Sequence, residues 1–325
     1  MPNDPQVPWT DEQWARVNQV IQEEASRARV AATFLPLYGP LPPDTDFMRA
    51  GVLSYRDRPA GAPPPRQQIA VDDETTILLP TLQVKVEVRA AQMADPDMTS
   101  VLALFRRAVN VLARLEDAVI FNGLIANPSA PPPVTPRDGV AGLPQIWEIS
   151  GGQPMDGLLT ARTSLEVRVR PRQVPEEWPE IGPDIVRAVS EAIGELEGRG
   201  HFGPFAVVLD QAFFLAAQTP DNASLVLPQD RIIPFLGGGS LLRSSTLPEN
   251  AGIVVALGGA PVELVVAADV SLQFLQVTTE PKYLFRVREK MALRIKEGDA
   301  IVRLSPLSSE SRRSTRSRGS TANAA

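Results

Sequence analysis

The stretch from Thr99 to Gly123 constrains the fold more than any other part of the chain. Its apolar residues recur every three or four positions, as in the buried face of an amphipathic helix. They are Val101, Phe105, Ala108, Val109, Leu112, Leu115, Val119 and Ile120. Thr99 or Ser100 is expected to cap the helix, and Asn122-Gly123 to end it. A helix of this length runs roughly 30 Å, so we predict that it is the spine on which a sheet packs.

Composition limits the possible functions. The 325 residues are 43% hydrophobic, enough for one large core or two modest ones. A net charge of −6 argues against nucleic-acid binding, and the chain has no cysteine for a disulfide, a thiolate nucleophile or a cysteine-ligated metal. The one histidine, His201, leaves little room for a catalytic triad or a zinc site. No signal-peptide pattern and no run of about 18 apolar residues is present, so a cytoplasmic protein without a membrane partner is expected.

The N-terminal part of the chain predicts a second helix, from Thr10 to about Val30. Thr10 is the expected N-cap, and acidic residues fill the first turn. The apolar stripe of this helix is narrow, which is typical of a helix that lies on a surface or on a partner. After it, Phe34 to Tyr38 is expected to be extended, and Gly39-Pro40 to break the chain.

Residues 47–73 contain few apolar residues and include a proline run, Pro63 to Pro65. A loop of this length is unusual inside a compact monomer. We therefore predict an arm that leaves the core and folds against a neighbouring subunit. Residues 75–88 follow as a predicted strand, because Val84, Val86 and Val88 alternate with charged residues.

The second half of the chain gives a sequence of shorter elements and no βαβ repeat, so the fold class is α+β. Residues 127–136 form a proline-rich loop, and a strand over 165–170 is expected at a sheet edge because Pro171 follows it. The further expected elements are a short strand within 142–149, helices over 184–198, 211–218 and 231–236, strands over 205–209, 241–244, 252–257, 262–267 and 272–275, two long strands joined near Gly298-Asp299, and a disordered tail.

No motif that carries chemistry stands out. Gly237 to Gly239 lacks the lysine and the following helix of a phosphate loop, and a turn is favoured. Glu116 and Asp117 point about 100° apart on a helix, so a solvated or salt-bridged edge is favoured over a catalytic carboxylate pair. No nucleophile accompanies His201. The tryptophans are expected in a core or an interface, and the arginines of the tail are expected to be solubilising.

One segment, Ala113 to Gly123, resembles the spine-helix signature of the encapsulin shell proteins, the linocin/bacteriocin-type family. Five further segments resemble the same family in the correct order. They are Thr10 to Trp14, Phe34 to Pro40, Gly203 to Leu209, Asp269 to Ser271, which resembles a turn of the family, and Phe285 to Ile301.

This resemblance implies the fold of a tailed-phage major capsid protein, with a peripheral domain, an axial domain and an extended E-loop. The implied divisions are 1–46 for an N-terminal helix and inner-face segment, 47–73 for the E-loop, 74–205 for the peripheral domain with the spine helix and a proline-rich insertion at 127–182, 206–257 for the axial domain, 258–304 for closing peripheral strands, and 305–325 for the tail.

The resemblance also implies a structural role rather than an enzymatic one: an icosahedral homo-oligomeric shell, or nanocompartment, in the cytoplasm. Such shells enclose a cargo enzyme, for example a ferritin-like protein or a dye-decolourising peroxidase, through a peptide at the cargo's C-terminus. The implied peptide groove uses Ile21, Ala25, Phe34, Leu37, Asp269, Val270 and Leu272. For each groove residue, simple packing within its own domain remains an alternative. The implied five-fold pore loop uses Thr219, Pro220, Asp221, Asn222, Ala223 and Ser224.

Some members of the family bind flavin through a tryptophan that follows the strand near residues 84–90. Residues 89–94 contain no tryptophan here, so we expect no flavin. We also expect no other cofactor, no metal and no catalytic residue. Two other functions stay open from sequence: a phage major capsid protein with the same fold and, more weakly, a hydrolase or protease.

Overall fold

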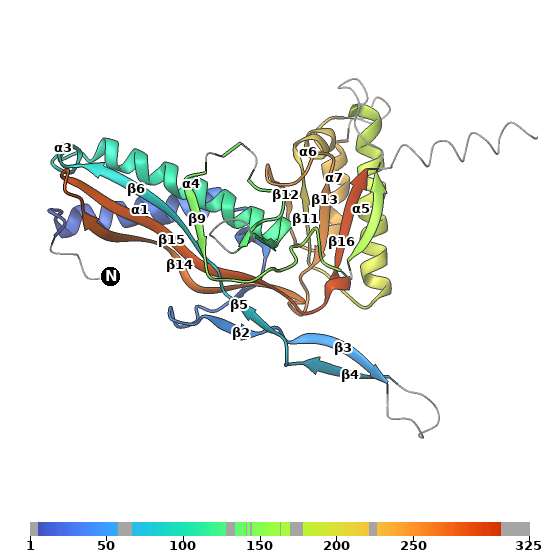
Figure 1. Cartoon of the computed structure of the whole chain (residues 1–325). Helices are drawn as coiled ribbons and strands as arrows, with labels where there is room; N and C mark the ends of the chain where they lie inside the picture. The colour runs from blue at the N-terminus through green and yellow to red at the C-terminus, as the bar shows by residue number, and fades with distance from the viewer. Residues whose placement is uncertain are drawn as a thin grey trace, which may run out of the picture. The chain divides into compact units, whose positions relative to one another are not determined.

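The computed structural model describes residues 6–57, 67–127, 134–140, 142–143, 145–162, 164–169, 178–220 and 226–306. It divides into two compact units (Figure 1). The first unit combines Met1–Arg162 with Ala260–Gly298, and the second combines Thr163–Gly259 with Asp299–Ala325. The sequence-based divisions instead place residues 163–205, 258–259 and 299–304 in the peripheral domain. In the described part of the chain, no helix has both the length and the apolar character needed to cross a membrane.

The first unit is built on a five-stranded sheet. Its strands, in spatial order, are β1 (Leu37–Tyr38), β14 (Val262–Val277), β15 (Lys282–Ile295), β6 (Thr81–Arg89) and β9 (Trp147–Ser150). β1 runs parallel to β14, and the other neighbours are antiparallel. Two separate strands were predicted over the range of β14. The structure has one long strand, because bulges between Val266 and Ser271 shift its register without ending its pairing with β15.

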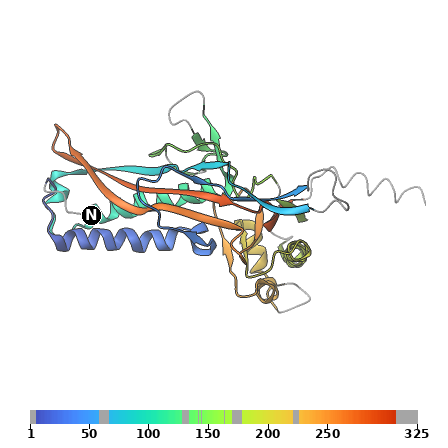
Figure 2. The same ribbon diagram turned by 90° about the horizontal axis from the view of Figure 1, so that it is seen from below.

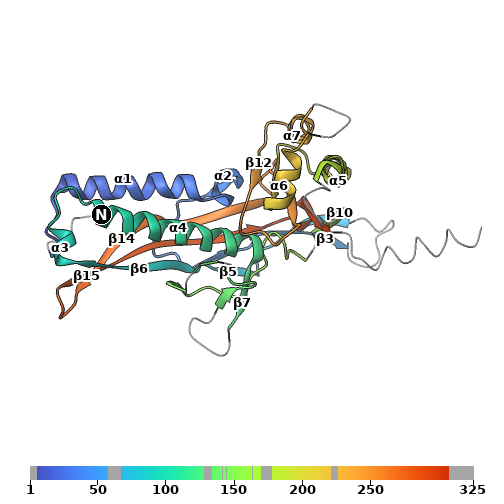
Figure 3. The ribbon, with the colours of Figure 1, turned by 90° about the horizontal axis from the view of Figure 1, so that it is seen from above.

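The predicted spine helix is confirmed as α4 (Thr99–Asn122). Its N-cap is Met98 in a left-handed conformation, so the prediction of Thr99 or Ser100 as cap was wrong. Gly123 ends the helix with φ of +79°, as predicted, and a Cβ there would lie 2.3 Å from the carbonyl oxygen of Met155. α4 packs on β6 and β15, and α1 (Asp11–Ala28) runs beside it and contacts β14 (Figures 2 and 3).

The start of α1 follows the sequence prediction closely. The Thr10 hydroxyl accepts a hydrogen bond from the Gln13 N–H at 3.2 Å, and the Gln13 side chain accepts one from the Thr10 N–H at 3.0 Å. This is a capping box. The apolar stripe of α1 is buried within its own unit, so the helix contributes to the core while its other face stays exposed. A short helix, α2 (Ala31–Phe34), follows and includes Phe34, where extended chain was expected, whereas Leu37 and Tyr38 form a strand, as expected.

Aromatic side chains fill the space between the helices and the sheet. Trp9 stacks on Phe285 with ring centroids 5.1 Å apart, and Trp14 and Phe105 meet Trp9 edge to face. All four side chains are buried. Trp9 and Trp14 are therefore core residues, which is one of the two environments expected for them.

The predicted arm, residues 47–73, takes part in two antiparallel ribbons, one of which includes a strand just beyond the arm. The first pairs β2 (Phe47–Arg49) with β5 (Thr76–Leu78), and the second pairs β3 (Val52–Asp57) with β4 (Gln67–Asp72) (Figure 1). The residues that join β3 to β4, 58–66, lie outside the described part. The first unit also contains α3 (Ala90–Met93) and a hairpin of β7 (Leu124–Ala126) and β8 (Val134–Pro136).

The second unit has its own five-stranded sheet and its own apolar core. The strand order is β10 (Leu165–Val169), β16 (Ile301–Pro306), β13 (Gly252–Ala256), β11 (Phe205–Leu209) and β12 (Leu241–Arg243), which puts β10 at an edge, as predicted. The helices of this unit are α5 (Trp178–Gly198), α6 (Gln211–Ala217), α7 (Pro228–Ile232) and a 3₁₀ turn, η2 (Ile233–Leu236). α5 packs on β10, β13 and β16.

The predicted start of the first helix in this unit was wrong. α5 begins at Trp178, before the predicted start at Asp184, and contains Pro183 within the helix. The two predicted closing strands are β15 and β16, and they are joined at the predicted position by a 3₁₀ turn, η3 (Gly298–Ala300), but they belong to different sheets. A period-two pattern identifies a strand but not the neighbour to which it pairs.

Candidate functional site

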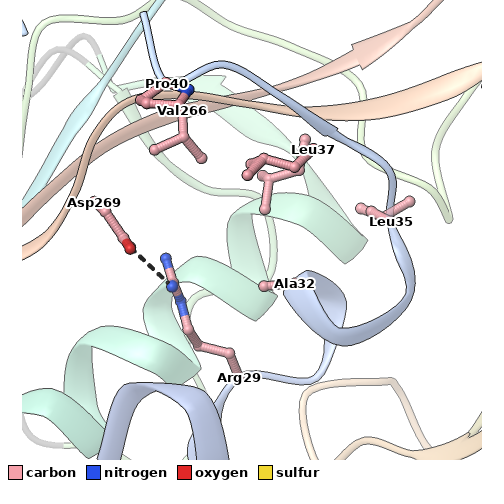
Figure 4. Close-up of a pocket in the computed structure, with 8 residues that line it drawn as sticks. Arg29, Ala32, Leu35, Leu37, Pro40, Val266 and Asp269 are labelled. Atoms are coloured by element: carbon pink, nitrogen blue, oxygen red, sulfur yellow. Dashed lines mark hydrogen bonds and ion pairs between the residues drawn. The ribbon is translucent and has the colours of Figure 1, made fainter. Parts of the chain in front are cut away.

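A cavity of about 250 Å³ opens in the first unit between the end of α1, α2, β1 and β14. Figure 4 shows its wall. The lining residues are Arg29, Ala32, Leu35, Leu37, Pro40, Leu264, Val266 and Asp269. Most of them are aliphatic, and the charged pair is confined to one part of the wall. An apolar cavity of about 150 Å³ holds a benzene ring, so this one has room for a branched aliphatic side chain.

The elements around the cavity are irregular, and the irregularity shapes its wall. β1 is only two residues long and lies at the edge of the sheet, so Leu37 keeps 62% of its surface exposed. In β14 the register shifts between Ala268 and Ser271. A bulge of this kind redirects side chains out of the regular alternation. Asp269 lies within it, with its side chain 59% exposed.

Arg29, the C-cap of α1, joins four elements through its guanidinium group. Its Nε donates to Glu116 on α4, Nη2 donates to Glu289 on β15, and Nη1 donates to Oδ1 of Asp269 at 3.0 Å. Figure 4 marks the Asp269 contact with a dashed line. Glu116 and Glu289 are fully buried, whereas the Arg29 side chain is 11% exposed. The guanidinium therefore lies between the cavity and the interior of the unit.

Asp117 holds the chain where α1 passes into α2. Its carboxylate oxygens accept hydrogen bonds from the backbone N–H groups of Val30 at 3.1 Å and Ala31 at 2.9 Å. Together, Glu116 and Asp117 attach both sides of this junction to α4. They do not form the solvated edge expected from sequence, because both are buried. The salt bridge of Glu116 agrees with the salt-bridged alternative.

Burial governs the electrostatics of this region. Loss of solvent and the neighbouring Glu116 raise the pKa of Asp117 to about 8, despite the opposing backbone hydrogen bonds. Burial also raises the pKa of Glu116, although Arg29 opposes that shift. The pKa of Glu289 is raised well above its usual range by burial and by Glu116. The region therefore retains protons at a pH where exposed carboxyl groups have lost them.

The structure brings together only part of the predicted peptide groove. Leu37 and Asp269 line the cavity. The other five residues are packed inside the first unit and do not line it: Ile21, Ala25, Phe34, Val270 and Leu272. Sequence reasoning missed Arg29, Ala32, Leu35, Pro40, Leu264 and Val266. An arginine at the end of a polar helix and aliphatic residues in a strand carry no local signal of a shared cavity.

The other candidate residues lie in the second unit. His201 is buried, and its Nε2 lies 3.1 Å from Asp299 Oδ1. Gly237 ends η2 with φ of +58°, as expected of a turn glycine. Of the predicted pore loop, Thr219 and Pro220 follow α6, and Asp221, Asn222, Ala223 and Ser224 lie outside the described residues. The predicted tail also lies outside them, apart from residues 305 and 306.

Comparison with protein families gives one match that covers most of the chain. The Linocin_M18 family, described as "Encapsulating protein for peroxidase", matches residues 3–128 and 153–292. The match spans parts of both units. Residues 129–152, which include β8 and β9, lie between the two matched segments, within the insertion predicted at 127–182.

A curated relative agrees with this match. The type 1 encapsulin shell protein EncA of Myxococcus xanthus is 26% identical over 321 residues, covering 94% of this chain and 96% of EncA. The aligned lengths show that the chain spans nearly the whole of this shell protein.

Solved structures share the fold. A virus-like particle protein from Pyrococcus furiosus aligns with a TM-score of 0.62 at 16% identity, over 90% of this chain and all of that one. A protein of Mycobacterium phage Bobi aligns with a TM-score of 0.55 at 14% identity, over 88% and 91% of the two chains. The fold is therefore capsid-like, as the sequence resemblance implied.

Proposed function

Because the chain belongs to the Linocin_M18 family of encapsulin shell proteins, we propose that its copies close into an icosahedral nanocompartment in the cytoplasm that encloses a cargo enzyme. The observation that carries this proposal is the family match, which extends over most of the chain. A shell protein acts structurally rather than as an enzyme. The phage-capsid alternative shares the fold, and the family match favours the shell.

The cargo is proposed to be a peroxidase. The description of the matching family names a peroxidase, which supports the dye-decolourising peroxidase over the ferritin-like protein as the first cargo to test. Residues 219–224 remain the proposed five-fold pore loop, and the arm at 47–73 remains the proposed E-loop.

The cavity beside Leu37 is the proposed docking site for the cargo peptide. An apolar peptide side chain entering it would bury its surface against Leu35, Leu37 and Val266, at about 25 cal/mol per Å² of apolar area. The edge strand β1 has no neighbour on its outer side among the described strands, which leaves backbone groups for an extended peptide to pair with. The proposed groove is therefore smaller than the one implied by sequence and is centred on Leu37 and Asp269.

Substitution of Leu37 tests the docking site. We expect Leu37→Asp to leave assembly intact and to reduce co-purified cargo at least about tenfold. An apolar side chain that enters the cavity would displace water from the new carboxylate, which costs free energy. The measurement is the ratio of cargo to shell protein in purified particles, by quantitative mass spectrometry.

Val277→Asp is the matched control. Val277 is also exposed, at the far end of β14, and does not line the cavity. Equal cargo content in particles of Leu37→Asp, Val277→Asp and the unchanged protein would place peptide docking elsewhere.

A further inference from the structure

At the end of α1 in the described part of the chain, several buried carboxyl groups surround a single arginine, Arg29. Glu116, Asp117 and Glu289 are all buried, and Asp269 lies at the edge of the same cluster. In the described structure, Arg29 is the cation that faces these four carboxyl groups. Several buried carboxylates around one guanidinium would leave uncompensated negative charge in a medium that solvates it poorly.

The hydrogen bonds of Glu116 and Glu289 indicate how the excess charge is removed. Each glutamate uses one oxygen to accept from Arg29. In the described structure, the other oxygens, Glu116 Oε1 and Glu289 Oε2, are buried without a donor. Both carboxyl groups accept from the same guanidinium, Glu116 from Nε and Glu289 from Nη2 of Arg29, and each acts on the pKa of the other as a hydrogen-bonding neighbour. A single proton between them would give each group a hydrogen bond and remove one charge.

We propose that Glu116 and Glu289 share one proton and, with Arg29, form a proton-dependent clasp that fixes the end of α1 and the start of α2 to α4 and β15. The clasp needs one carboxylate, to pair with Arg29, and one carboxylic acid, to donate to that carboxylate. Loss of the proton leaves two like charges in contact and loosens the junction. This inference concerns the fold of the first unit and does not depend on the proposed docking site.

The neighbouring elements supply few other charges to the clasp. Asp117 on α4 and Asp269 on β14 are the further carboxyl groups that act on it. Several other charged residues of the packed elements pair elsewhere: Glu24 with Arg27, Lys85 with Glu148, Glu87 with Lys282, Lys290 with Asp46, and Arg294 with Glu263. Arg288 precedes Glu289 on β15, and successive side chains of a strand point to opposite faces. α2 contains no titratable side chain.

The direction of the pH dependence follows from the proton count. The closed clasp binds the shared proton above about pH 4.3, where an exposed glutamate has released its own. Opening therefore releases a proton, and the opening constant rises about tenfold per pH unit for each proton released. The clasp is firmest in acid and loosens as the pH rises towards the pKa of the pair. Asp117 adds a second proton of the same sign up to about pH 8.

Hydrogen exchange directly measures the slope of this pH dependence, which is the change in the opening constant per pH unit. The amide hydrogens of the purified full-length protein are exchanged between about pH 5 and pH 8. The opening constant is the exchange rate observed in peptides that cover residues 21–35, divided by the intrinsic exchange rate of the same amides. In Glu289→Gln the amide donates to Glu116 without a titrating proton. We expect the opening constant of this variant to rise about tenfold less per pH unit than that of the unchanged protein.

Two further variants complete the test. Glu116→Gln reverses donor and acceptor and is expected to lose the same slope. Glu263→Gln is the matched control, because Glu263 is also a buried glutamate of the first unit but pairs with two cations, Arg294 and Lys296. Its slope is expected to equal that of the unchanged protein. An unchanged slope in both clasp variants would overturn the proposal.

A second measurement covers the case in which the clasp variants do not fold. Infrared spectroscopy of the unchanged protein, with and without ¹³C-labelled glutamate, reports protonated glutamic acid near neutral pH. The carboxylic acid band is expected at neutral pH. Its absence would overturn the proposal without any substitution.

Discussion

Asp117 lies at the junction of α1 and α2, fully buried, and accepts hydrogen bonds from two backbone N–H groups of the junction. Burial and the adjacent Glu116 raise its pKa to about 8. The folded protein therefore holds a proton from about pH 4 to pH 8 that the unfolded chain releases. Because the folded state binds more protons in this window, its stability falls as the pH rises, by up to about 1.4 kcal/mol per pH unit.

Asp117→Asn removes this titration and keeps an oxygen that can accept from Val30 and Ala31. We expect the thermal midpoint of the variant to fall less steeply than that of the unchanged protein between about pH 5 and pH 8. Asp44→Asn, at an exposed aspartate of the same unit, is the control and is expected to follow the unchanged protein. Parallel curves for Asp117→Asn and the unchanged protein would show that the Asp117 proton does not contribute to stability.

The clustering of these charged residues could not be predicted from sequence. Glu116 and Asp117 occupy adjacent positions of α4, and their local pattern fits an exposed edge. Their burial depends on Arg29, which lies 87 positions away from Glu116, and on Glu289, which lies 260 positions away from Arg29. Only the assembled sheet brings these residues together, and no periodicity within one element records it.

The capping box of α1 gives a prediction about a whole element. We expect Thr10→Ala to cost about 1 kcal/mol, because the Gln13 N–H loses its side-chain acceptor at the helix start. The first turn should then exchange its amide hydrogens faster, while the last turn, held by Arg29, is unchanged. Hydrogen exchange resolved along residues 10–28 measures the difference.

Arg16→Ala is the control for this helix, since Arg16 is exposed on α1 and alanine is the best helix former. It is expected to leave exchange in the first turn unchanged. Faster exchange along all of α1 in Thr10→Ala would mean that the helix opens as one unit and that the box does not act locally.

The arm supports an element-scale prediction about assembly. Leu53, Ile69 and Val71 are exposed apolar residues on one face of the β3–β4 ribbon, since Leu53 lies opposite Val71 and Ile69 lies two residues before Val71. A neighbouring subunit covering this face would bury them. We expect Ile69→Asp to shift the protein from particles to unassembled subunits with unchanged circular dichroism, as size-exclusion chromatography would show.

Ser54→Asp is the matched control, because Ser54 lies on the opposite face of the same ribbon. It introduces the same charge and is expected to assemble normally. Normal assembly of both variants would exclude this face of the arm from subunit contacts.

Elements defined by a local pattern were predictable. α1 and α4 follow from a period of three or four residues, β11 from five consecutive apolar residues, and the edge position of β10 from the proline that follows. Features set by long-range pairing were not. The joining of two predicted strands into β14 and the separation of β15 from β16 depend on partners far away in the sequence.

At the scale of the whole molecule, the family explains features that a monomer does not. A two-stranded ribbon with an exposed apolar face and a cavity beside a short edge strand are costly to leave exposed to solvent. In the proposed shell, the ribbon would gain a partner from a neighbouring subunit and the cavity would gain one from a cargo peptide. The fold class and the family were readable from six sequence segments in order, but the cavity required the three-dimensional structure.

Electron microscopy of the purified protein, with its mass measured in solution, tests whether the chain forms a shell. Closed, uniform particles of megadalton mass with icosahedral symmetry are expected and, after expression of the protein with its native neighbours, an enclosed enzyme. A monomer or dimer as the stable species, under conditions in which the chain is folded, would contradict the shell.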